Sequence, residues 1–288
     1  MPIVIEHLNY IYMANGPYET HALHDVNLTI RDGEFVGLIG HTGSGKSTLV
    51  QHLNGLIAPT SGRVLIDGMD LADKATDRRA IRQRVGLVFQ YPENQLFEET
   101  VAKDIAFGPR NLGLDEREID RRVRDAMRRV ALDDGALAER SVFELSGGQM
   151  RRVAIAGVLA MEPQVLVLDE PCAGLDPRGR EEILGLIENL HRESGTTIVM
   201  VSRSMDDVAS LAERVIVMIH GEVVMDGAPR DVFACGEELR GMGLDVPQAV
   251  QLAAKLRERG LAIPEGIYRI EEVREAILAL AGKEGPHA

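Results

Sequence analysis

Residues 34–53 carry the sequence EFVGLIGHTGSGKSTLVQHL, the segment that is most informative about the fold. Its first part, 34–40, is a short apolar run that ends in glycine, which predicts a buried strand. The segment GHTGSGKS at 40–47 matches the pattern GxxxxGK[ST], and the apolar residues of 46–53 have helical spacing. A strand, a glycine loop and a helix in this order predict a loop that binds phosphate.

The glycine loop has three means of holding a phosphate group. Its glycines let successive backbone N–H groups converge on phosphate oxygens, and the start of the following helix adds a partial positive charge. Lys46 would bridge the β- and γ-phosphates, and the Ser47 hydroxyl would bind Mg²⁺. The residues expected to contact the nucleotide are Gly40, His41, Thr42, Gly43, Ser44, Gly45, Lys46, Ser47 and Thr48.

Three further apolar runs predict the rest of a sheet around that loop. They lie at 85–89, 165–168 and 197–201, and each is bounded by stretches with helical patterns. Continuous apolar runs are typical of parallel strands that are covered on both faces. Residues 3–30 instead alternate apolar and polar side chains, which predicts an antiparallel β flank. We therefore expect an α/β protein.

Two regions outside the sheet have helical patterns. Residues 98–160 hold charged helical segments and almost no strand pattern, so we expect a helical subdomain inserted into a domain that spans 1–230. The tail, 231–288, is expected to form a small helical module. One tail helix is predicted to open at the DVP of 245–247, which offers an N-cap and an early proline. The other predicted helix places on one face Ile270, Val273, Ile277 and Leu280.

Two carboxylates follow the apolar run at 165–168. Asp169 and Glu170 stand at the carboxyl end of a predicted strand, where an α/β sheet presents its ligand-binding edge. We expect Asp169 to hold Mg²⁺, directly or through water, and Glu170 to polarise an attacking water. Alone, the pair would mark only the solvated end of a strand, but the glycine loop earlier in the chain favours the catalytic interpretation.

A second glycine turn, LSGGQ at 145–149, also leads into a helical segment and offers another anion-binding helix start. A chain with two such turns resembles the ATP-binding cassette (ABC) ATPases, in which LSGGQ of one subunit closes over ATP held by the P-loop of the other. The motif order supports this: the P-loop, Gln90 after a strand, LSGGQ, LDEP at 168–171 and AGLD at 173–176. The resemblance covers roughly residues 3–230 and implies a P-loop NTPase of the ABC class that hydrolyses ATP.

The resemblance implies how these motifs work together. Gln90 would reach the Mg²⁺ and signal to a transmembrane partner, and Asp176 would cross the interface of a head-to-tail dimer. The metal ligands would be Ser47, Gln90 and Asp169. The signature turn that closes the partner's site would consist of Ser146, Gly147, Gly148 and Gln149.

An aromatic side chain near the N-terminus would stack on adenine in this family. Tyr12 is the preferred candidate, with Tyr10 and Tyr18 as alternatives, because stacking needs only a ring face and a suitable loop. A structural role on a strand remains open for each of the three.

One position departs from the family pattern. A histidine usually follows the strand after LDEP, whereas the segment VSRSMDD at 201–207 has Arg203. Arginine can donate to a γ-phosphate, but it is always charged and cannot act as a neutral imidazole beside Glu170. The site is therefore either slow, with Arg203 holding the γ-phosphate, or it accepts arginine as a substitute donor with modest loss. The expected catalytic residues are Glu170, Arg203 and Lys46.

Within the superfamily, the sequence is similar to the cassettes of energy-coupling factor (ECF) transporters. The similarity rests on FQYPENQLF at 89–97, TVAKDIAFGP at 100–109 and GGQMRRVAIAGVLA at 147–160. The second, A-prime type of ATP-binding subunit is the most similar, because of the segments at 98–100, 150–152 and 243–247.

This second resemblance implies the partners. An A-prime subunit pairs with a different A-type cassette, so a heterodimer is expected and a homodimer is the alternative. Both contact a transmembrane T subunit, which recruits exchangeable S subunits that bind vitamins or metal ions. Residues 90–109 would accept coupling helices of T, whose arginine could meet Glu93, Glu98, Glu99 or Asp104. The tail helices would bury an apolar face against the partner cassette, or would pack as the core of the tail itself.

The composition excludes several other classes. With 32 Lys and Arg against 45 Asp and Glu, the net charge is −13, which argues against nucleic acid as a partner. Neither CxxC nor HExxH spacing occurs, so a metal is expected only with its ligand, and Cys172 and Cys235 are expected to be buried or half-buried. No apolar run approaches the ~18–20 residues of a membrane span, and the N-terminus lacks a signal-peptide pattern. The resemblance to ECF cassettes implies in addition that the chain is a peripheral protein at the cytoplasmic face of the cell membrane.

Together these patterns predict the ATP-binding and ATP-hydrolysing subunit of an ECF-type importer. It would use ATP and Mg²⁺ to power uptake of a vitamin or metal ion. The alternative is a regulatory nucleotide-binding subunit with a degenerate, slow ATP site, which Arg203 would favour. The substrate is not encoded in this chain, because in the resembled transporters the S subunit selects it.

Overall fold

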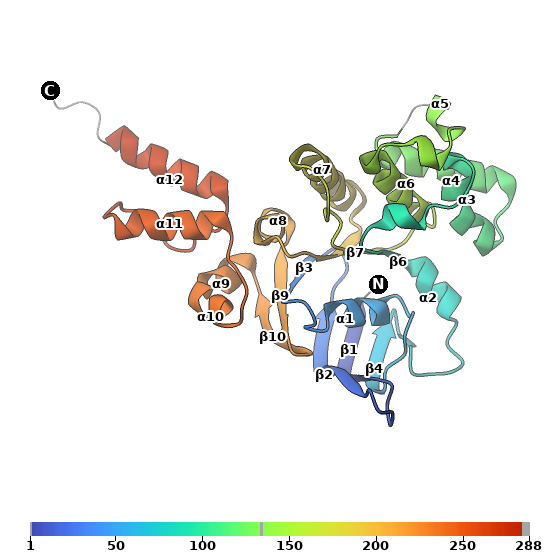
Figure 1. Cartoon of the computed structure of the whole chain (residues 1–288), viewed down its shortest axis with the longest axis horizontal. Helices are drawn as coiled ribbons and strands as arrows, with labels where there is room; N and C mark the ends of the chain where they lie inside the picture. Colours follow the sequence, from blue (N-terminus) through green and yellow to red (C-terminus); the bar gives the residue numbers. More distant parts are fainter. Residues whose placement is uncertain (1, 133–134, 284–288) are drawn as a thin grey trace.

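The computed structural model describes residues 2–132 and 135–283, which form two sheets with helices around them (Figure 1). The larger sheet consists of β3 (Phe35–Ile39), β6 (Val85–Val88), β7 (Val165–Asp169), β8 (Thr197–Val201), β9 (Arg214–Ile219) and β10 (Glu222–Gly227). Its spatial order is β10-β9-β3-β8-β7-β6. Five strands run parallel, and only β10 pairs antiparallel, with β9. The apolar runs that predicted parallel strands are thus confirmed.

The parallel strands are buried on both faces, which explains why their sequences are apolar throughout. Along β3, Phe35 and Ile39 belong to a core that faces helices, whereas Val36 and Leu38 belong to a core shared with the second sheet. The alternation follows from the strand geometry, in which successive side chains point to opposite faces. Because β3, β8 and β7 are parallel neighbours, the carboxyl ends of β3 and β7 lie at the same edge of the sheet.

The second sheet is antiparallel and lies over the other core. It consists of β1 (Ile3–Tyr12), β2 (Thr20–Ile30), β4 (Ser61–Ile66) and β5 (Met69–Asp70), in the order β2-β1-β4-β5. Helix α1 (Lys46–Leu53) packs Leu49, Val50 and Leu53 into the same core. The predicted antiparallel flank is confirmed, and it places the end of β1 close to the start of α1.

Helices make up the described part of residues 98–160, where no strand occurs. They are drawn in green at one side of the parallel sheet in Figure 1. Three of their starts have side-chain caps, from Thr100, Asp115 and Ser146, as expected for these residue types. The elements are α3 (Val101–Leu112), α4 (Glu116–Arg129), α5 (Gly135–Ala138), the 3-10 turn η2 (Val142–Glu144) and α6 (Gly147–Leu159).

The remaining helices of the first 241 residues surround the large sheet. They are α2 (Arg78–Arg84), the 3-10 turn η1 (Pro92–Gln95), α7 (Pro177–Ser194), α8 (Met205–Leu211), α9 (Pro229–Ala234) and α10 (Gly236–Gly241). Helices α7 and α8 pack on the same face as α6, with Ile187 and Val208 fully buried. Throughout 2–132 and 135–283, no helix has the length and apolar character that crossing a bilayer requires.

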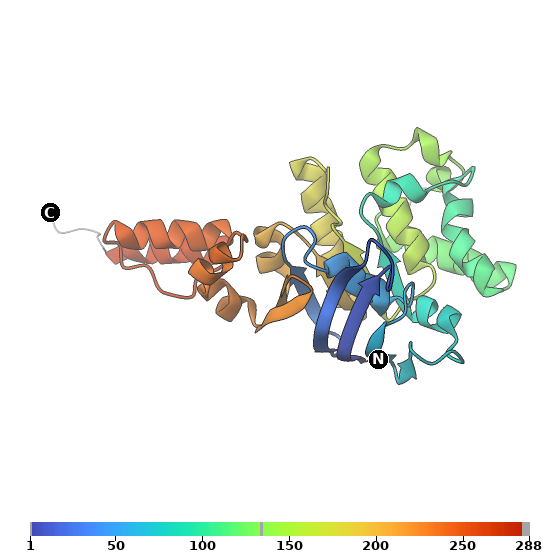
Figure 2. The same cartoon turned by 60° about the horizontal axis from the view of Figure 1, so that its bottom comes forward.

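The predicted tail, 231–288, is divided, because Val232, Phe233 and Leu239 of α9 and α10 pack in the main core. The rest of the tail forms a helical pair, α11 (Gln248–Glu258) and α12 (Ile270–Lys283), that projects from the sheet domain at the end opposite to the helical insert (Figure 2). The predicted cap of α11 is wrong in detail, because Pro247 is the N-cap and offers no side-chain bond. Asp245 instead accepts hydrogen bonds from its neighbour's backbone, Val246 N–H, and from the Gln251 amide.

The predicted apolar face of α12 is divided between two environments. Val273 is buried in the core of the tail, and Leu280 packs against that core. Ile270 and Ile277 are 54% and 41% exposed. The tail therefore has a small core of its own and an apolar stripe that it does not use.

The two cysteines also differ. Cys172 is half-buried, as expected, and burial raises the pKa of its thiol to about 12. Cys235 is exposed, so the expectation of a buried thiol is wrong there. Cys235 lies at the junction of the short helices α9 and α10, where its side chain does not pack into a core.

Candidate active site

The glycine loop joins the end of β3 to the start of α1. Gly40 and Gly45 have φ angles of 156° and 99°, which side-chain-bearing residues rarely adopt. A Cβ on Gly40 would lie 2.3 Å from the Met218 carbonyl oxygen, and one on Gly45 would lie 2.7 Å from the Ala22 carbonyl oxygen. The loop can therefore run against its neighbours only as glycine. The N–H groups in the first turn of α1 have no partners within the helix, which leaves them available to an anion.

Lys46 folds into the loop that precedes it. Its ammonium donates to the carbonyl oxygens of Gly40 at 2.7 Å and His41 at 2.9 Å, and to the Ser44 hydroxyl at 3.3 Å. Burial lowers the pKa of Lys46, and the nearby Glu170 and Asp169 oppose that shift. The loop thus holds the buried Lys46 ammonium among carbonyl and hydroxyl oxygens, at the place where phosphate oxygens would bring negative charge.

Two carboxylates stand at the end of β7 beside the loop. The Ser47 hydroxyl donates to Asp169 at 3.3 Å, although 122 residues separate the two in the sequence. Glu170 follows with φ of 52°, and its N–H donates to the Val201 carbonyl. Burial raises the pKa of both carboxyl groups, and the Ser47 bond partly offsets this for Asp169. Both carboxylates would gain from a cation in the site.

The donor set at this place suits Mg²⁺. A hydroxyl and a carboxylate already face each other, and the Gln90 side chain lines the same hollow. These are oxygen ligands, which Mg²⁺ prefers, and they leave positions for phosphate oxygens and water. The described residues contain no group of three His, Cys, Asp or Glu side chains able to hold a metal, so the ligand's own oxygens would complete the shell.

Arg203 pairs directly with Glu170. Its Nε lies 3.0 Å from Glu170 Oε1, and the guanidinium counteracts the rise that burial causes in the pKa of Glu170. The arginine side chain is 64% exposed and the glutamate 14%, so the contact sits at the mouth of the site. Arg203, the residue at which the sequence departs from the family pattern, is therefore in contact with Glu170, the predicted catalytic carboxylate.

These groups surround a hollow of about 300 Å³. Tyr12 lines it and its hydroxyl lies 3.2 Å from the Thr48 hydroxyl. Tyr10 packs edge-on against Tyr12, and Tyr18 is 77% exposed and does not line the hollow. Lining residues that sequence reasoning missed are Thr20, His21, Ala22 and Val201. The first three enter because β2 pairs with β1, which no local motif reveals.

The signature turn lies outside this hollow. Ser146 caps α6, and Ser146 and Gln149 exchange side-chain and backbone bonds in a reciprocal capping box. Asp176 caps α7 by accepting from Gly179 N–H at 2.7 Å. None of Ser146, Gly147, Gly148, Gln149 and Asp176 is among the residues that line the 300 Å³ hollow. The sequence-predicted residues thus separate into one group around Lys46 and another on the helical insert and the start of α7.

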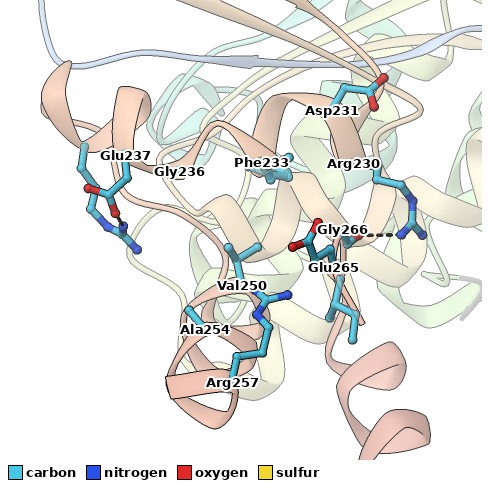
Figure 3. Close-up of a pocket in the computed structure, with 13 residues that line it drawn as sticks. Arg230, Asp231, Phe233, Gly236, Glu237, Val250, Ala254, Arg257, Glu265 and Gly266 are labelled. Carbon is cyan, nitrogen blue, oxygen red and sulfur yellow. Dashed lines mark hydrogen bonds and ion pairs between the residues drawn. The ribbon is translucent and has the colours of Figure 1, made fainter. Parts of the chain in front are cut away.

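A larger hollow of about 710 Å³ lies elsewhere, between α9, α10 and α11 (Figure 3). Its arginines are engaged within the chain: Arg230 donates to the Gly266 carbonyl, Arg240 to Glu237, and Arg257 to the Pro264 carbonyl. No glycine loop leads into a helix there to bind phosphate. Size alone therefore does not identify the reactive site.

Comparison with known proteins identifies the family. The model described as ABC transporter matches residues 23–173. The energy-coupling factor transporter ATP-binding protein EcfA2 of Clostridium perfringens is 60% identical over 257 residues, which are 89% of this chain and 90% of that protein. The solved structure of cbiO1 of Clostridium perfringens, part of the ABC transporter complex cbiONQ, has a TM-score of 0.73 and 41% identity, and the match covers 88% of this chain and 98% of that one.

A second solved structure adds a chemical state. The ATP-binding cassette MJ0796, a dimer in a post-hydrolysis state with ADP and Pi, has a TM-score of 0.70 and 31% identity, and the match covers 79% of this chain and 98% of that one. These similarities confirm the fold class, the ATPase activity and the resemblance predicted from the sequence motifs. The chain belongs to the ABC transporter family and, within it, to the ATP-hydrolysing EcfA2 subunits of energy-coupling factor transporters.

Proposed function

We propose that this chain is one of two cassettes of an ECF-type importer and hydrolyses Mg·ATP at an interface between the two. The observation that carries the proposal is the separation of the motifs. Lys46, Asp169 and Glu170 surround one hollow, while the signature turn of 146–149 lies outside it. Two chains arranged head to tail would complete each site with the other chain's turn. The dimeric state of MJ0796 is consistent with this arrangement.

In that site each side chain has a defined task. Mg²⁺, held by Ser47 and Asp169 with Gln90 nearby, would supply charge that screens the phosphates. Lys46 would exchange its carbonyl partners for phosphate oxygens. Glu170 would accept a hydrogen bond from the attacking water and orient it. Tyr12 would stack on the adenine ring.

The membrane partner would bind at residues 90–109. Phe97 and Phe107 form an edge-on pair, and they are 57% and 44% exposed. Neighbouring Tyr91 is also 44% exposed. An exposed cluster of aromatic side chains is typical of a protein interface. A coupling helix of a T subunit is the partner that we propose for this surface.

The acidic residues on this surface are not equally available. Glu93 is bonded to Arg151, Asp104 accepts from the N–H groups of Phe97 and Glu98, and Glu99 pairs with Lys103. The Glu98 carboxylate has no hydrogen bond or ion pair in the described part of the chain. We therefore propose Glu98 as the acidic group that meets an arginine of the coupling helix.

The tail would contact the other cassette. Its unused stripe on α12, formed by Ile270, Ile277 and Leu278, is exposed and apolar. Burial of that stripe at a subunit interface would remove it from water. We propose a heterodimer with an A-type cassette, with a homodimer as the alternative. The complex would lie at the cytoplasmic face of the membrane and take up a vitamin or metal ion selected by an S subunit.

The test is reconstitution of the complex. This chain would be co-expressed with a candidate A-type cassette, T subunit and S subunit, purified through the T subunit and placed in vesicles. ATP-dependent uptake is the expected result. Glu98→Arg is expected to lower recovery of this chain with T, whereas the control Glu188→Arg, on the exposed side of α7, is not. Recovery of this chain in a complex that lacks T, or uptake by vesicles that lack this chain, would refute the proposal.

The contact of Arg203 with Glu170 favours a second possibility, in which this chain's own site turns over slowly and its occupancy regulates the other site. Glu170→Gln in this chain alone distinguishes the two in the reconstituted complex. Lost uptake supports a working catalytic site, and near-normal uptake supports regulation. Arg203→His provides an independent check, because unchanged turnover would exclude the idea that arginine slows the site.

A further inference from the structure

Arg151, in the first turns of α6, is the most deeply buried charged side chain among those described, with 1% exposure. Its Nε and Nη2 atoms form a fork on Glu93, with distances of 3.1 Å and 2.7 Å. Its Nη1 donates to the carbonyl oxygens of Pro171 at 3.0 Å and Ala173 at 2.8 Å. All three guanidinium nitrogens are therefore bonded to partners within the chain.

The partners of Arg151 belong to two segments that flank the active site. Glu93 lies in η1, three residues after Gln90. Pro171 and Ala173 lie in the stretch that joins Glu170 to Asp176. One side chain thus ties the helix that begins at the signature turn to the segment after Gln90 and to the segment that leads to Asp176.

The last two segments also lie close to each other. Tyr91 has φ of 55°, an uncommon value for a residue with a side chain, and its ring lies near Gly174. A Cβ added to Gly174 would lie 3.3 Å from the Tyr91 ring, which leaves room there only for glycine without a shift of the ring. Arg151 therefore bonds to two segments that are also neighbours in space.

A purely structural role would not require a buried guanidinium that forms a fork on Glu93. Removing a guanidinium from water is costly, and a well-packed apolar residue of similar size often serves stability as well or better. A planar fork, in contrast, fixes direction and register, which an ammonium or an apolar side chain cannot do. The neighbouring Arg152 shows the difference, because it pairs at the surface with Glu182 of α7.

We propose that Arg151 is a positioning residue that makes the signature turn, the segment after Gln90 and the segment before Asp176 move as one unit. The proposal rests on the function proposed above, in which the signature turn and Asp176 face the partner's nucleotide. Membrane-subunit contacts at residues 91–99 would then set how this chain closes the partner's site. Arg151 acts through these segments and does not touch the reacting atoms of its own site.

The test uses the reconstituted complex with Arg151→Lys in this chain and Arg152→Lys as the matched control. Arg151→Lys keeps the charge but loses the fork. We expect ATP binding at this chain's own P-loop to be unchanged, because Lys46 and its partners do not contact Arg151. The kcat for ATP hydrolysis is expected to fall by about tenfold or more, as for other misplaced catalytic groups. Arg152→Lys is expected to behave as the wild type.

A second readout separates positioning from simple loss of stability. Hydrogen exchange would be followed at 91–96 and 146–153 in the complex, with and without a non-hydrolysable ATP analogue. Both segments are expected to respond in the wild type, whereas in Arg151→Lys the response at 146–153 is lost. Glu93→Gln is expected to reproduce the Arg151→Lys phenotype, and the double variant is expected to be no worse than either single variant.

Three outcomes would each overturn the inference. In the first, the Arg151→Lys complex is folded and has the wild-type kcat. In the second, kcat falls equally in Arg151→Lys and Arg152→Lys. In the third, hydrogen exchange at 91–96 and 146–153 still responds to the ATP analogue in Arg151→Lys. Failure of the proposed function is a different result, because the wild-type complex itself would then show no ATP-dependent uptake. A variant that fails only by unfolding would lose ATP binding as well, and Glu93→Gln would then decide the question.

Discussion

The P-loop and the signature turn are both glycine-rich turns that open a helix, but they are built differently. In the P-loop, the N-cap Gly45 is left-handed and offers no side-chain cap to α1. In the signature turn, Ser146 and Gln149 form a reciprocal capping box at the start of α6, which satisfies the N–H groups of these two residues. The first turn therefore has no side-chain cap at its helix start, whereas the second has one.

The glycines show the same contrast. A Cβ on Gly45 would collide with the Ala22 carbonyl oxygen, but one on Gly147 or Gly148 would meet, apart from its chain neighbours and the backbone of its own helix, no described atom within 4 Å. The chain itself requires the P-loop glycine. Nothing in the described chain excludes a side chain at the signature glycines, so any requirement for glycine there must come from a molecule that binds at the turn. The fold of this chain thus constrains the P-loop glycine, whereas the signature glycines would be constrained by the partner's nucleotide in the function that we propose.

The largest effect is expected at the P-loop. Lys46→Ala removes the ammonium that bonds to the loop carbonyl groups, and it should reduce ATP hydrolysis by about a hundredfold or more. ATPase assays and nucleotide binding of the reconstituted complex measure this. Lys74→Ala, at an exposed site, is the control. Hydrolysis at near wild-type rates in Lys46→Ala would mean that the hollow around Lys46 is not the reactive site.

The contrast between the glycines gives the next effect. Gly45→Ala should lower the free energy of unfolding by about 1–3 kcal/mol, because it forces a strained backbone against a carbonyl oxygen. Gly148→Ala should leave stability unchanged or slightly higher, since alanine favours a helix. Urea denaturation of the isolated chain measures both.

The two glycine turns are expected to differ also in the assembled complex. Gly148→Ala should reduce hydrolysis by about tenfold, because the added methyl group faces the incoming nucleotide. If Gly148→Ala unfolds the chain, or hydrolyses ATP normally in the complex, the comparison of the two turns does not hold.

Helix α1 differs from α6 also in carrying a buried histidine, which makes the P-loop side sensitive to acid. His52 is fully buried, its Nδ1 donates to the Thr48 carbonyl, and its Nε2 has no hydrogen-bond partner among the described residues. Burial lowers the pKa of His52 below its ordinary value of 6.5. Below pH 6.5 the unfolded chain takes up a proton that the folded chain resists, so folded-state stability is lost as the pH falls.

The predicted loss is about 1 kcal/mol per pH unit below 6.5, and His52→Phe should abolish it while keeping the edge contact with Tyr10. Denaturant unfolding at pH 7.5 and pH 5.5 measures the difference between wild type and variant. His7→Phe, at an exposed site, should follow the wild type. Equal acid sensitivity of His52→Phe and the wild type would count against this account of α1.

The smallest effect is expected at Tyr12. Tyr12→Leu removes the ring face and should raise KM for ATP about fivefold, which corresponds to the loss of about 1 kcal/mol of stacking. Tyr12→Phe loses only the contact with the Thr48 hydroxyl and should change KM by less than about twofold. Steady-state kinetics of the complex provides both values. A larger effect of phenylalanine than of leucine would indicate a hydrogen-bonding role for Tyr12 and argue against stacking.

Much of this architecture could be predicted from short stretches of sequence. The apolar runs predicted β6, β7 and β8 to within a residue, because a strand buried on both faces must be apolar throughout. The cap of α11 could not be placed in the same way. Asp245 had a competing partner in Gln251, and a local pattern does not show which hydrogen bond a side chain will make.

The site shows the same limit. The sequence favoured Tyr12 but left Tyr10 and Tyr18 as alternatives, and of the three only Tyr12 lines the hollow once β1 pairs with β2. The sequence made Glu93 a candidate partner for the arginine of the coupling helix. In the fold, however, Glu93 is bonded to Arg151, which is 58 residues away in the chain. Sequence spacing carries no information about such contacts.

The sequence by itself determined the P-loop, because the left-handed glycines, the lysine and the helix start all lie within residues 40–48 and follow local dihedral preferences. It also determined the strands through their apolar runs. Only the tertiary structure decided that Ser47 meets Asp169, that Arg203 meets Glu170 and that the signature turn stays apart from both. These contacts depend on the order of strands in the sheet and on how helices pack over it, which no short segment of the chain specifies.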